Sequence, residues 1–306
     1  MIRKLVAAIV VLGIAAAAAG WFLSAPEHLP ESVVANLPAG DAGRGELIFW
    51  AGGCASCHAP AGAKGEAKLG LSGGQRLETP FGIFVAPNIS SDPRDGIGAW
   101  TLTEFADAML KGTSPQGENF YPAFPYTSYA RMTPQDVSDL FAFMQSLPPV
   151  SGRAAGHELG FPFNIRRGVG LWKRLYLDSA PVIAEDQLHG NTDLSVLNRG
   201  RYLVEGPGHC GECHTPRNAI GGLEKNLWLA GASAAAGEGK VPNITSGEGG
   251  ISSWSASDIA YYLESGFTPD YDSVGGEMVS VQENMAKLPA SDREAIAAYL
   301  KAVPAH

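Results

Sequence analysis

Cys54-Ala55-Ser56-Cys57-His58 and Cys210-Gly211-Glu212-Cys213-His214 are the stretches that decide how this sequence folds. Together they use all four cysteines of the 306-residue chain. In each stretch the two thiols stand about one helical turn apart, so both sulfurs face the same side, and an imidazole follows directly. Two thiols in this position can add to the vinyl groups of a porphyrin while the histidine binds its iron. The pattern predicts two covalently bound haem c groups, attached at Cys54, Cys57, Cys210 and Cys213.

Other uses of paired cysteines fit this pattern less well. Four cysteines in an exported protein would first suggest two disulfides, but the C-x-x-C-H spacing argues against them. A zinc site needs two C-x-x-C pairs, or one pair with two matched histidines, in a single domain. Here the pairs lie 156 residues apart, each with one adjacent histidine. A thioredoxin-like dithiol needs a βαβ setting, and the sequence shows none.

The surroundings of the two motifs repeat as well. Arg-Gly precedes each motif by about ten positions, and a proline follows each histidine at the second position. Pro87-Asn88-Ile89 corresponds to Pro242-Asn243-Ile244, and Trp100 corresponds to Trp254. A period of this length indicates a duplicated domain and not a solenoid unit.

Helix signals also occur in pairs. A capping box begins a helix at Thr101, and its acidic analogue begins one at Ser255. These helices are expected to end at Gly112 and Gly266, which are typical C′ glycines. Pro134 at the first helical position begins the closing helix of the first repeat. Continuous alternating strands are hard to find, so the sequence predicts an all-α fold.

The N-terminus carries an export signal. Arg3 and Lys4 precede an uncharged run from Leu5 to Leu23, close to the roughly 20 residues that cross a bilayer as a helix. By the positive-inside rule, the chain after this run faces the periplasm. We expect a retained membrane anchor. A cleaved signal peptide, with its site in the stretch 15–19, is the alternative, and it also gives export.

Residues near the motifs are predicted to complete each haem site. His58 and His214 are the expected proximal iron ligands, each donating its other ring nitrogen to a backbone carbonyl in the loop that follows. Further candidates for the haem pocket are Trp100, Trp254, Asn88, Asn243 and Arg217. The alternative for the paired tryptophans and asparagines is core packing and turn formation. For the arginine it is a solvated surface position.

The distal ligands are not fixed by the motif. Met278 follows a glycine-rich loop that lets the backbone approach a flat cofactor, so it is preferred to Met285. In the first repeat we expect Met132, with core packing of this residue as the alternative. Met109 and Met144 lie inside expected helices and are interpreted as core residues.

Charge narrows the range of partners. The net charge of −9, without any cluster of lysines and arginines, argues against nucleic-acid binding. The negative charge indicates either ordinary solubility or an acidic docking face for a basic redox partner.

Nearly the whole chain after the N-terminal run resembles membrane-bound cytochrome c subunits of bacterial periplasmic dehydrogenases for alcohols, aldehydes, gluconate and N-heterocycles. The resemblance is carried by residues 79–82, 87–89, 96–100, 121–129, 161–166 and 213–218. It implies that electrons pass from a dehydrogenase catalytic subunit to quinone or a terminal oxidase. Many such subunits have three haems, and many have a methionine ligand at the position of Phe124. Phenylalanine cannot ligate iron, which is why Met132 is expected instead.

We therefore predict two tandem class I cytochrome c-like domains after an N-terminal transmembrane helix. The expected parts are 1–24 (anchor or signal), 25–39 (tether), 40–150 (first domain), 151–189 (linker with an amphipathic helix near 166–177) and 190–306 (second domain). The expected function is electron transfer from a periplasmic dehydrogenase to quinone, a soluble cytochrome or a terminal oxidase, without catalysis by this chain. The alternative is a dihaem redox enzyme of the peroxidase or thiosulfate-oxidising type, with one open or displaceable haem ligand.

Overall fold

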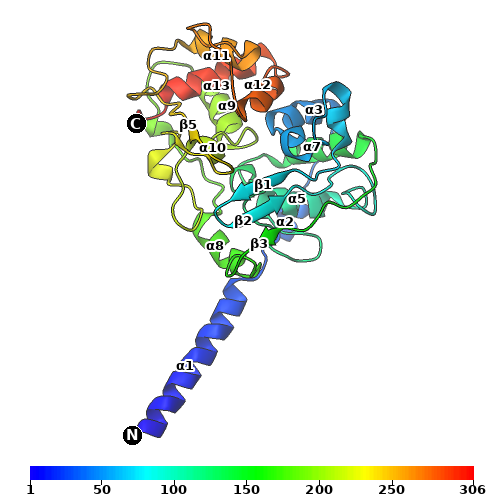
Figure 1. Ribbon diagram of the computed structural model, residues 1–306, viewed down its shortest axis with the longest axis vertical. Coiled ribbons are helices and arrows are strands. Elements are labelled where there is room, and N and C mark those ends of the chain that lie inside the picture. The colour runs from blue at the N-terminus through cyan, green and yellow to red at the C-terminus, as the bar shows by residue number, and fades with distance from the viewer.

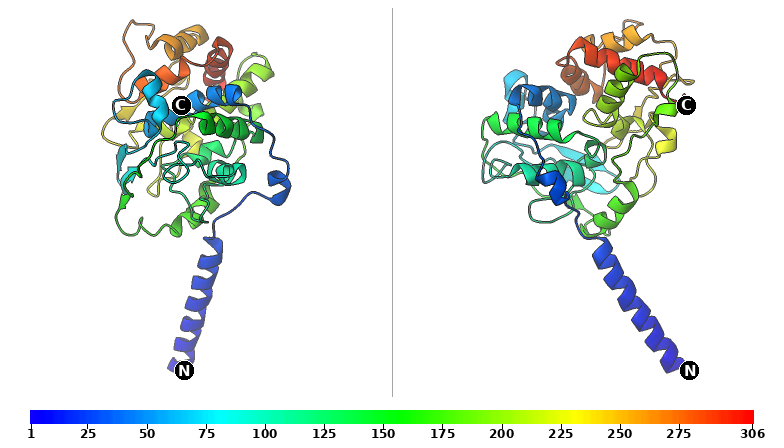
Figure 2. Two further views of the ribbon diagram at one scale, coloured as in Figure 1. Left: turned by 90° about the vertical axis from the view of Figure 1, so that its right-hand side faces the viewer. Right: turned by 180° about the vertical axis from the view of Figure 1, so that it is seen from behind.

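The computed structural model describes all residues from 1 to 306 and is mostly helical (Figure 1). A long helix, α1 (Ile2–Leu23), projects from a body in which two groups of helices lie side by side (Figures 1 and 2). No residue of α1 is buried, and its length and apolar composition suffice to cross a membrane. The rest of the chain forms the body.

The first group of helices, here called the first unit, surrounds the first motif. Its helices are α3 (Ala42–Ala51), α4 (Cys54–His58), α5 (Leu102–Lys111), α6 (Tyr126–Tyr129) and α7 (Pro134–Ser146). Helices α3 and α7 cross closely at Gly45, where an added Cβ would lie 1.9 Å from the carbonyl oxygen of Asp139. Around this crossing, apolar residues between Ile48 and Leu147 form one core.

The second unit repeats this arrangement. Its helices are α9 (Leu194–Glu205), α10 (Gly211–His214), α11 (Ala256–Ser265), α12 (Met278–Met285) and α13 (Ala290–Ala302). Helices α9 and α13 cross at Gly200, where a Cβ would again lie 1.9 Å from a carbonyl oxygen, that of Ala295. A separate core is built from residues between Ile183 and Val303, joined by Ala51 from the first unit.

The predicted helix boundaries are confirmed. Thr101 and Ser255 each form a complete capping box, and Pro134 is the first residue of α7. Gly112 and Gly266 follow α5 and α11 with φ values of 59° and 79°, the left-handed conformation that glycine adopts without steric cost. Local side-chain chemistry therefore sets where these helices begin and end.

Two small sheets were not expected from the sequence. Strands β1 (Arg76–Thr79), β2 (Gly82–Val85) and β3 (Glu158–Leu159) form an antiparallel sheet, and β4 (Ala232–Ser233) pairs with β5 (Lys240–Val241). Strands of two to four residues are too short to show an alternating pattern. Because β3 comes from the predicted linker, that linker is part of the first unit's sheet, and Arg76 binds Glu158 across it at 2.8 Å.

The segment expected to be a tether is bound to the first unit. Residues 25–39 include α2 (Glu31–Val34). The carboxylate of Asp107 accepts a bond from the backbone N–H of Leu29 at 2.7 Å and lies 2.6 Å from Nδ1 of His28. A composition rich in proline and alanine gives no sign of this buried acceptor, so the docking could not be predicted.

The other linker element, α8 (Gly168–Tyr176), lies where an amphipathic helix was expected, and it holds the end of α1. The guanidinium of Arg167 lies 4.3 Å from the ring of Trp21 and donates to Ser24 Oγ at 2.9 Å. Gly170 allows this approach, because a Cβ there would lie 2.1 Å from the carbonyl oxygen of Ser24. Helix α1 is thus fastened to the body.

Candidate functional site

Both motifs lie in a short turn of helix immediately after the first helix of their unit. The chain enters α4 through Gly53, whose φ of 58° turns it sharply. No disulfide joins any two of the four cysteines. Burial raises the pKa of Cys54 and of Cys210 to about 12, so both are neutral. A thioether is also neutral, and attachment to a porphyrin would therefore bury no charge at these positions.

The two histidines are oriented in the same way. Nδ1 of His58 donates to the carbonyl oxygen of Pro87 at 2.8 Å, and Nδ1 of His214 donates to that of Pro242 at 2.8 Å. With the proton held on Nδ1, the lone pair is on Nε2, the atom that would bind iron. Burial lowers the pKa of both imidazoles, which favours this neutral form. The predicted bond to a backbone carbonyl is present in both units, and the donor set fits haem.

The asparagines of the repeated Pro-Asn-Ile stretch hold the loop that carries this acceptor. Asn88 Nδ2 donates to the carbonyl oxygen of Val150 at 2.6 Å, and Asn243 Nδ2 donates to that of His306 at 2.9 Å. In both residues the amide oxygen accepts a backbone N–H two positions later. The structure thus gives both asparagines the turn-forming role that was the alternative to a haem contact.

The other pocket candidates contact neighbouring protein groups. Trp100 and Trp254 are half-buried against the cores, and the ring of Trp254 packs at 5.3 Å from that of Tyr262. Arg217 forms an ion pair with Glu212 and donates to the carbonyl oxygen of Gly221 at 2.8 Å. Its guanidinium is therefore engaged by protein groups.

The predicted distal ligands have different surroundings. Met278 is the first residue of α12 and is half-buried at the edge of the second core. Met132 directly precedes Thr133, the N-cap of α7, and lies inside the first core with 5% of its surface exposed. Ligation by either residue stays a prediction.

The two motifs meet, which could not be predicted because contacts between units leave no local sequence pattern. His209, next to the second motif, donates from Nε2 to the carbonyl oxygen of Gly52 at 3.1 Å. Asn284 of α12 donates to Ser56 Oγ, inside the first motif, at 2.9 Å. Burial is the main cause of the raised pKa of Cys57, and Glu277 and then Cys213 add smaller contributions. The two attachment turns therefore lie next to each other.

Glu212 is a further residue that sequence reasoning missed. It is buried between the cysteines of the second motif and accepts bonds from the hydroxyls of Thr127 at 2.9 Å and Ser128 at 2.8 Å, both in the first unit. Burial raises its pKa, but Arg217 and these hydroxyls together lower it by more. The net pKa is below the ordinary value, and the carboxylate is ionised. An acidic residue inside the second motif, where the first has Ser56, was the available signal.

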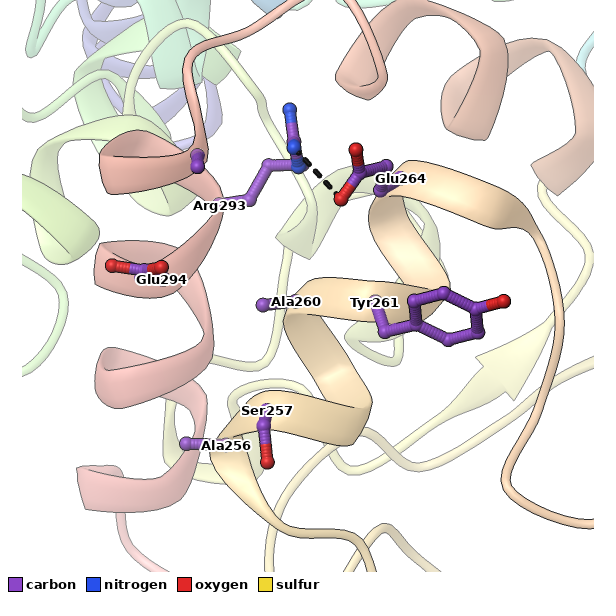
Figure 3. Close-up of a pocket in the computed structure, with 8 residues that line it drawn as sticks. Ala256, Ser257, Ala260, Tyr261, Glu264, Arg293 and Glu294 are labelled. Carbon is purple, nitrogen blue, oxygen red and sulfur yellow. Dashed lines mark ion pairs between the residues drawn. The ribbon is translucent and has the colours of Figure 1, made fainter.

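A shallow groove elsewhere on the second unit is not part of these sites. It runs between α11 and α13 and is lined by residues such as Ala256, Ala260 and Glu294, with an ion pair between Arg293 and Glu264 at 3.0 Å (Figure 3). None of the predicted haem residues lines it. Nor do three or more His, Cys, Asp or Glu side chains gather anywhere in a way that could hold a metal ion by themselves.

Comparison with known proteins identifies the family. A cytochrome c family profile matches residues 42–148. The chain is 53% identical over 303 residues to a protein named diheme cytochrome c-type from Cereibacter sphaeroides, covering 99% of both sequences.

Two longer relatives have more specific names. The fructose dehydrogenase cytochrome subunit of Gluconobacter japonicus is 37% identical over 86% of this chain, which spans 52% of that protein. The gluconate 2-dehydrogenase cytochrome c subunit of Pantoea cypripedii is 34% identical over 86% of this chain, which spans 59% of it. The chain therefore belongs to the cytochrome c family, as a c-type cytochrome with two covalently bound haem groups.

Proposed function

We propose that this cytochrome takes electrons from the catalytic subunit of a periplasmic dehydrogenase and passes them to quinone, a soluble cytochrome or a terminal oxidase. The observation that carries the proposal is the contact between the two attachment turns, at His209–Gly52 and Asn284–Ser56. Each haem iron supplies a one-electron couple when bound. Two such groups fixed next to each other provide a continuous route through the protein.

The residues of the chain have distinct tasks in this proposal. Cys54, Cys57, Cys210 and Cys213 anchor the two haems. His58 and His214 bind iron through Nε2, oriented by the carbonyls of the Pro-Asn-Ile loops. Met278 is the proposed distal ligand of the second haem, and a thioether ligand raises the reduction potential. Two tandem domains, at 40–150 and 190–306, are proposed to correspond to the two cores.

The contacts between the units would keep the distance between the haems constant. Glu212 is held from both units, by Thr127 and Ser128 on one side and by Arg217 on the other. Such a buried, fully bonded carboxylate is costly to separate from its partners, because an uncompensated charge would remain. Electron transfer between the haems would thus not require any domain movement.

The partner and the location follow from two kinds of support. Relatives named as cytochrome subunits of fructose and gluconate dehydrogenases make a dehydrogenase the proposed partner. Because the chain spans only about half to three fifths of those relatives, its own partner and acceptor are part of the proposal. Helix α1 is proposed to anchor the chain in the inner membrane, with both haems in the periplasm.

The proposal can be tested in membranes of the source bacterium. Oxygen uptake would be measured with and without the gene, on alcohols, aldehydes, sugars, sugar acids and N-heterocycles. We expect respiration to be lost on one substrate class and restored by the full chain, but not by the Cys54→Ala/Cys57→Ala variant. Unchanged respiration on every substrate would contradict a role between a dehydrogenase and the respiratory chain.

A further inference from the structure

The methionines of the two units do not occupy equivalent positions. The three buried methionines of the first unit correspond to leucines at equivalent positions of the second unit. The pairs are Met109 with Leu263, Met132 with Leu288 and Met144 with Leu300. All six side chains are buried, with exposed fractions between 3% and 7%. Leucine cannot ligate iron, so these are positions that the fold fills with an apolar side chain.

The structure identifies the residue equivalent to Met278. After the C′ glycine of α5, Phe120 N–H donates back to the carbonyl oxygen of Gly112 at 2.8 Å. After the C′ glycine of α11, the N–H of Val274 donates to the carbonyl oxygen of Gly266 at 2.7 Å. Four residues beyond each of these bonds stand Phe124 and Met278. Phe124 is therefore the counterpart of the proposed ligand of the second haem.

A second contact shows where the two loops differ in length. The hydroxyl of Tyr129 donates to the carbonyl oxygen of Gly52 at 3.3 Å. Its counterpart Met285 lies beside Gly208, with Cε 3.7 Å from the position of a glycine Cβ. The segment from Met278 to Met285 is therefore two residues longer than the equivalent segment from Phe124 to Tyr129. Beyond them the units are again in register, and Met132 matches Leu288, not Met278.

Histidines near the first unit are bound to protein groups. His28 Nδ1 lies on the carboxylate of Asp107, His157 Nδ1 accepts the N–H of Val85 at 3.1 Å, and His209 donates to Gly52. None of them comes from the loop equivalent to the one that presents Met278.

We propose that the first haem has no methionine ligand, and that its distal side binds a small, neutral diatomic molecule such as carbon monoxide or nitric oxide in the ferrous state. The ligand class follows from the surroundings of Phe124, whose ring centroid lies 5.8 Å from Phe120, 5.6 Å from Tyr129 and 6.2 Å from Tyr126. Aromatic walls accept a neutral molecule, whereas an anion would lose its hydration without compensation. The proposal rests on haem attachment at Cys54 and Cys57, and it replaces Met132 as the expected ligand.

The test uses the full-length chain with both haems, purified in detergent. Carbon monoxide titration of the reduced protein would give the number of accessible irons. The long-wavelength charge-transfer band of the oxidised protein would report methionine ligation. The variants are Phe124→Met, Met132→Leu and Met278→Leu. Met132→Leu should fold, because leucine fills the same position in the second unit and this exchange costs little in cores.

We expect one carbon monoxide per chain in the parent and in Met132→Leu, with an unchanged charge-transfer band. Met278→Leu should abolish the band. Phe124→Met should double the band and weaken carbon monoxide binding roughly tenfold or more, because a thioether then competes for the iron. If Met132→Leu halves the charge-transfer band and creates a new binding site for carbon monoxide, Met132 is the ligand and the proposal fails.

Two other outcomes would also overturn the inference. A parent protein that binds no carbon monoxide has another protein ligand at the first haem. Rapid turnover of hydrogen peroxide would contradict the proposed ligand class. These outcomes are separable from the proposed electron-transfer function, which would fail through a haem content below two or through unchanged respiration in the gene deletion.

Discussion

The first and second units share their proximal sides and differ on their distal sides. In both, a glycine allows two helices to cross, and a proline carbonyl orients the histidine at 2.8 Å. In the segments before α7 and α13 the units diverge, because Phe124 of the first unit corresponds to Met278, the first residue of α12, in the second. The difference teaches that histidine orientation and helix packing can be kept while the residue at the proposed ligand position is changed.

Removal of each cysteine pair should have the largest effect and separate the two haems. Cys54→Ala/Cys57→Ala and Cys210→Ala/Cys213→Ala should each leave one haem per chain, measured by pyridine haemochrome and mass. Each altered unit also loses the apolar surface that the macrocycle buries, and its helix content should fall.

The methionine charge-transfer band makes this comparison sharper. The band should remain in Cys54→Ala/Cys57→Ala and disappear in Cys210→Ala/Cys213→Ala, because Met278 is the proposed ligand of the second haem. The opposite result would assign the methionine-ligated haem to the first unit.

Substitution of the two crossing glycines by alanine should have the next-largest effect. Gly45→Ala and Gly200→Ala each place a Cβ 1.9 Å from a backbone oxygen, and we expect a loss of roughly 2–3 kcal/mol in the free energy of unfolding. Gly43→Ala is the matched control in α3, since its nearest contact would be the Asp41 side chain at 3.3 Å. Thermal melts followed by circular dichroism would measure this, and equal effects of Gly43→Ala and Gly45→Ala would refute the steric explanation.

A pH-dependent difference should come from Lys173, which only the first unit binds. Its Nζ donates to the carbonyl oxygens of Lys111 and Gly112 at 2.7 and 2.6 Å, and burial lowers its pKa to about 7, with Glu27 and Lys111 opposing each other as smaller influences. Between this pKa and the value of 10.5 for the unfolded chain, the unfolded state binds the additional proton.

Stability should therefore rise with pH over that window, by at most roughly 1.4 kcal/mol per pH unit. Lys173→Met should flatten this dependence, whereas a change at the more exposed Lys225 should not. Chemical denaturation from pH 7 to 10 would measure both, and an unchanged slope in Lys173→Met would show that another group titrates.

The smallest effect is expected at the paired helix caps. The hydroxyl of Thr101 accepts the N–H of Glu104 at 3.2 Å, and that of Ser255 accepts the N–H of Asp258 at 3.1 Å. Thr101→Ala and Ser255→Ala should each cost about 1 kcal/mol. Urea unfolding would compare them, and a cost in one unit several times that in the other would show that the caps are not equivalent.

Features of the fold that depend on neighbouring residues could be predicted from the sequence. Helix starts at Thr101 and Thr133 and the stop at Gly112 follow from caps that act within one turn. The attachment motifs are equally local. The bond from each histidine to a backbone carbonyl could be foreseen in kind, although its acceptor in the first unit lies 29 positions away.

Features that depend on distant partners could not be predicted. Residues 25–39 have the composition of a tether, which does not reveal that Asp107 binds Leu29 and His28. The meeting of the two motifs through His209 and Gly52 likewise has no sequence pattern. For Met132, side-chain chemistry permitted ligation, and only the register between the units shows that it matches Leu288.

The attachment of α1 to α8 has a mechanical consequence. Because Arg167 and Gly170 fix the end of α1 against the body, the helix and the haem-bearing units would move as one rigid body. A transmembrane helix adjusts to bilayer thickness by tilting. In the anchored form proposed above, each change of tilt would rotate the whole body, whose helix α11 lies at the end opposite the N-terminus (Figure 1). Lipid composition would thereby set the angle at which this cytochrome meets its partners.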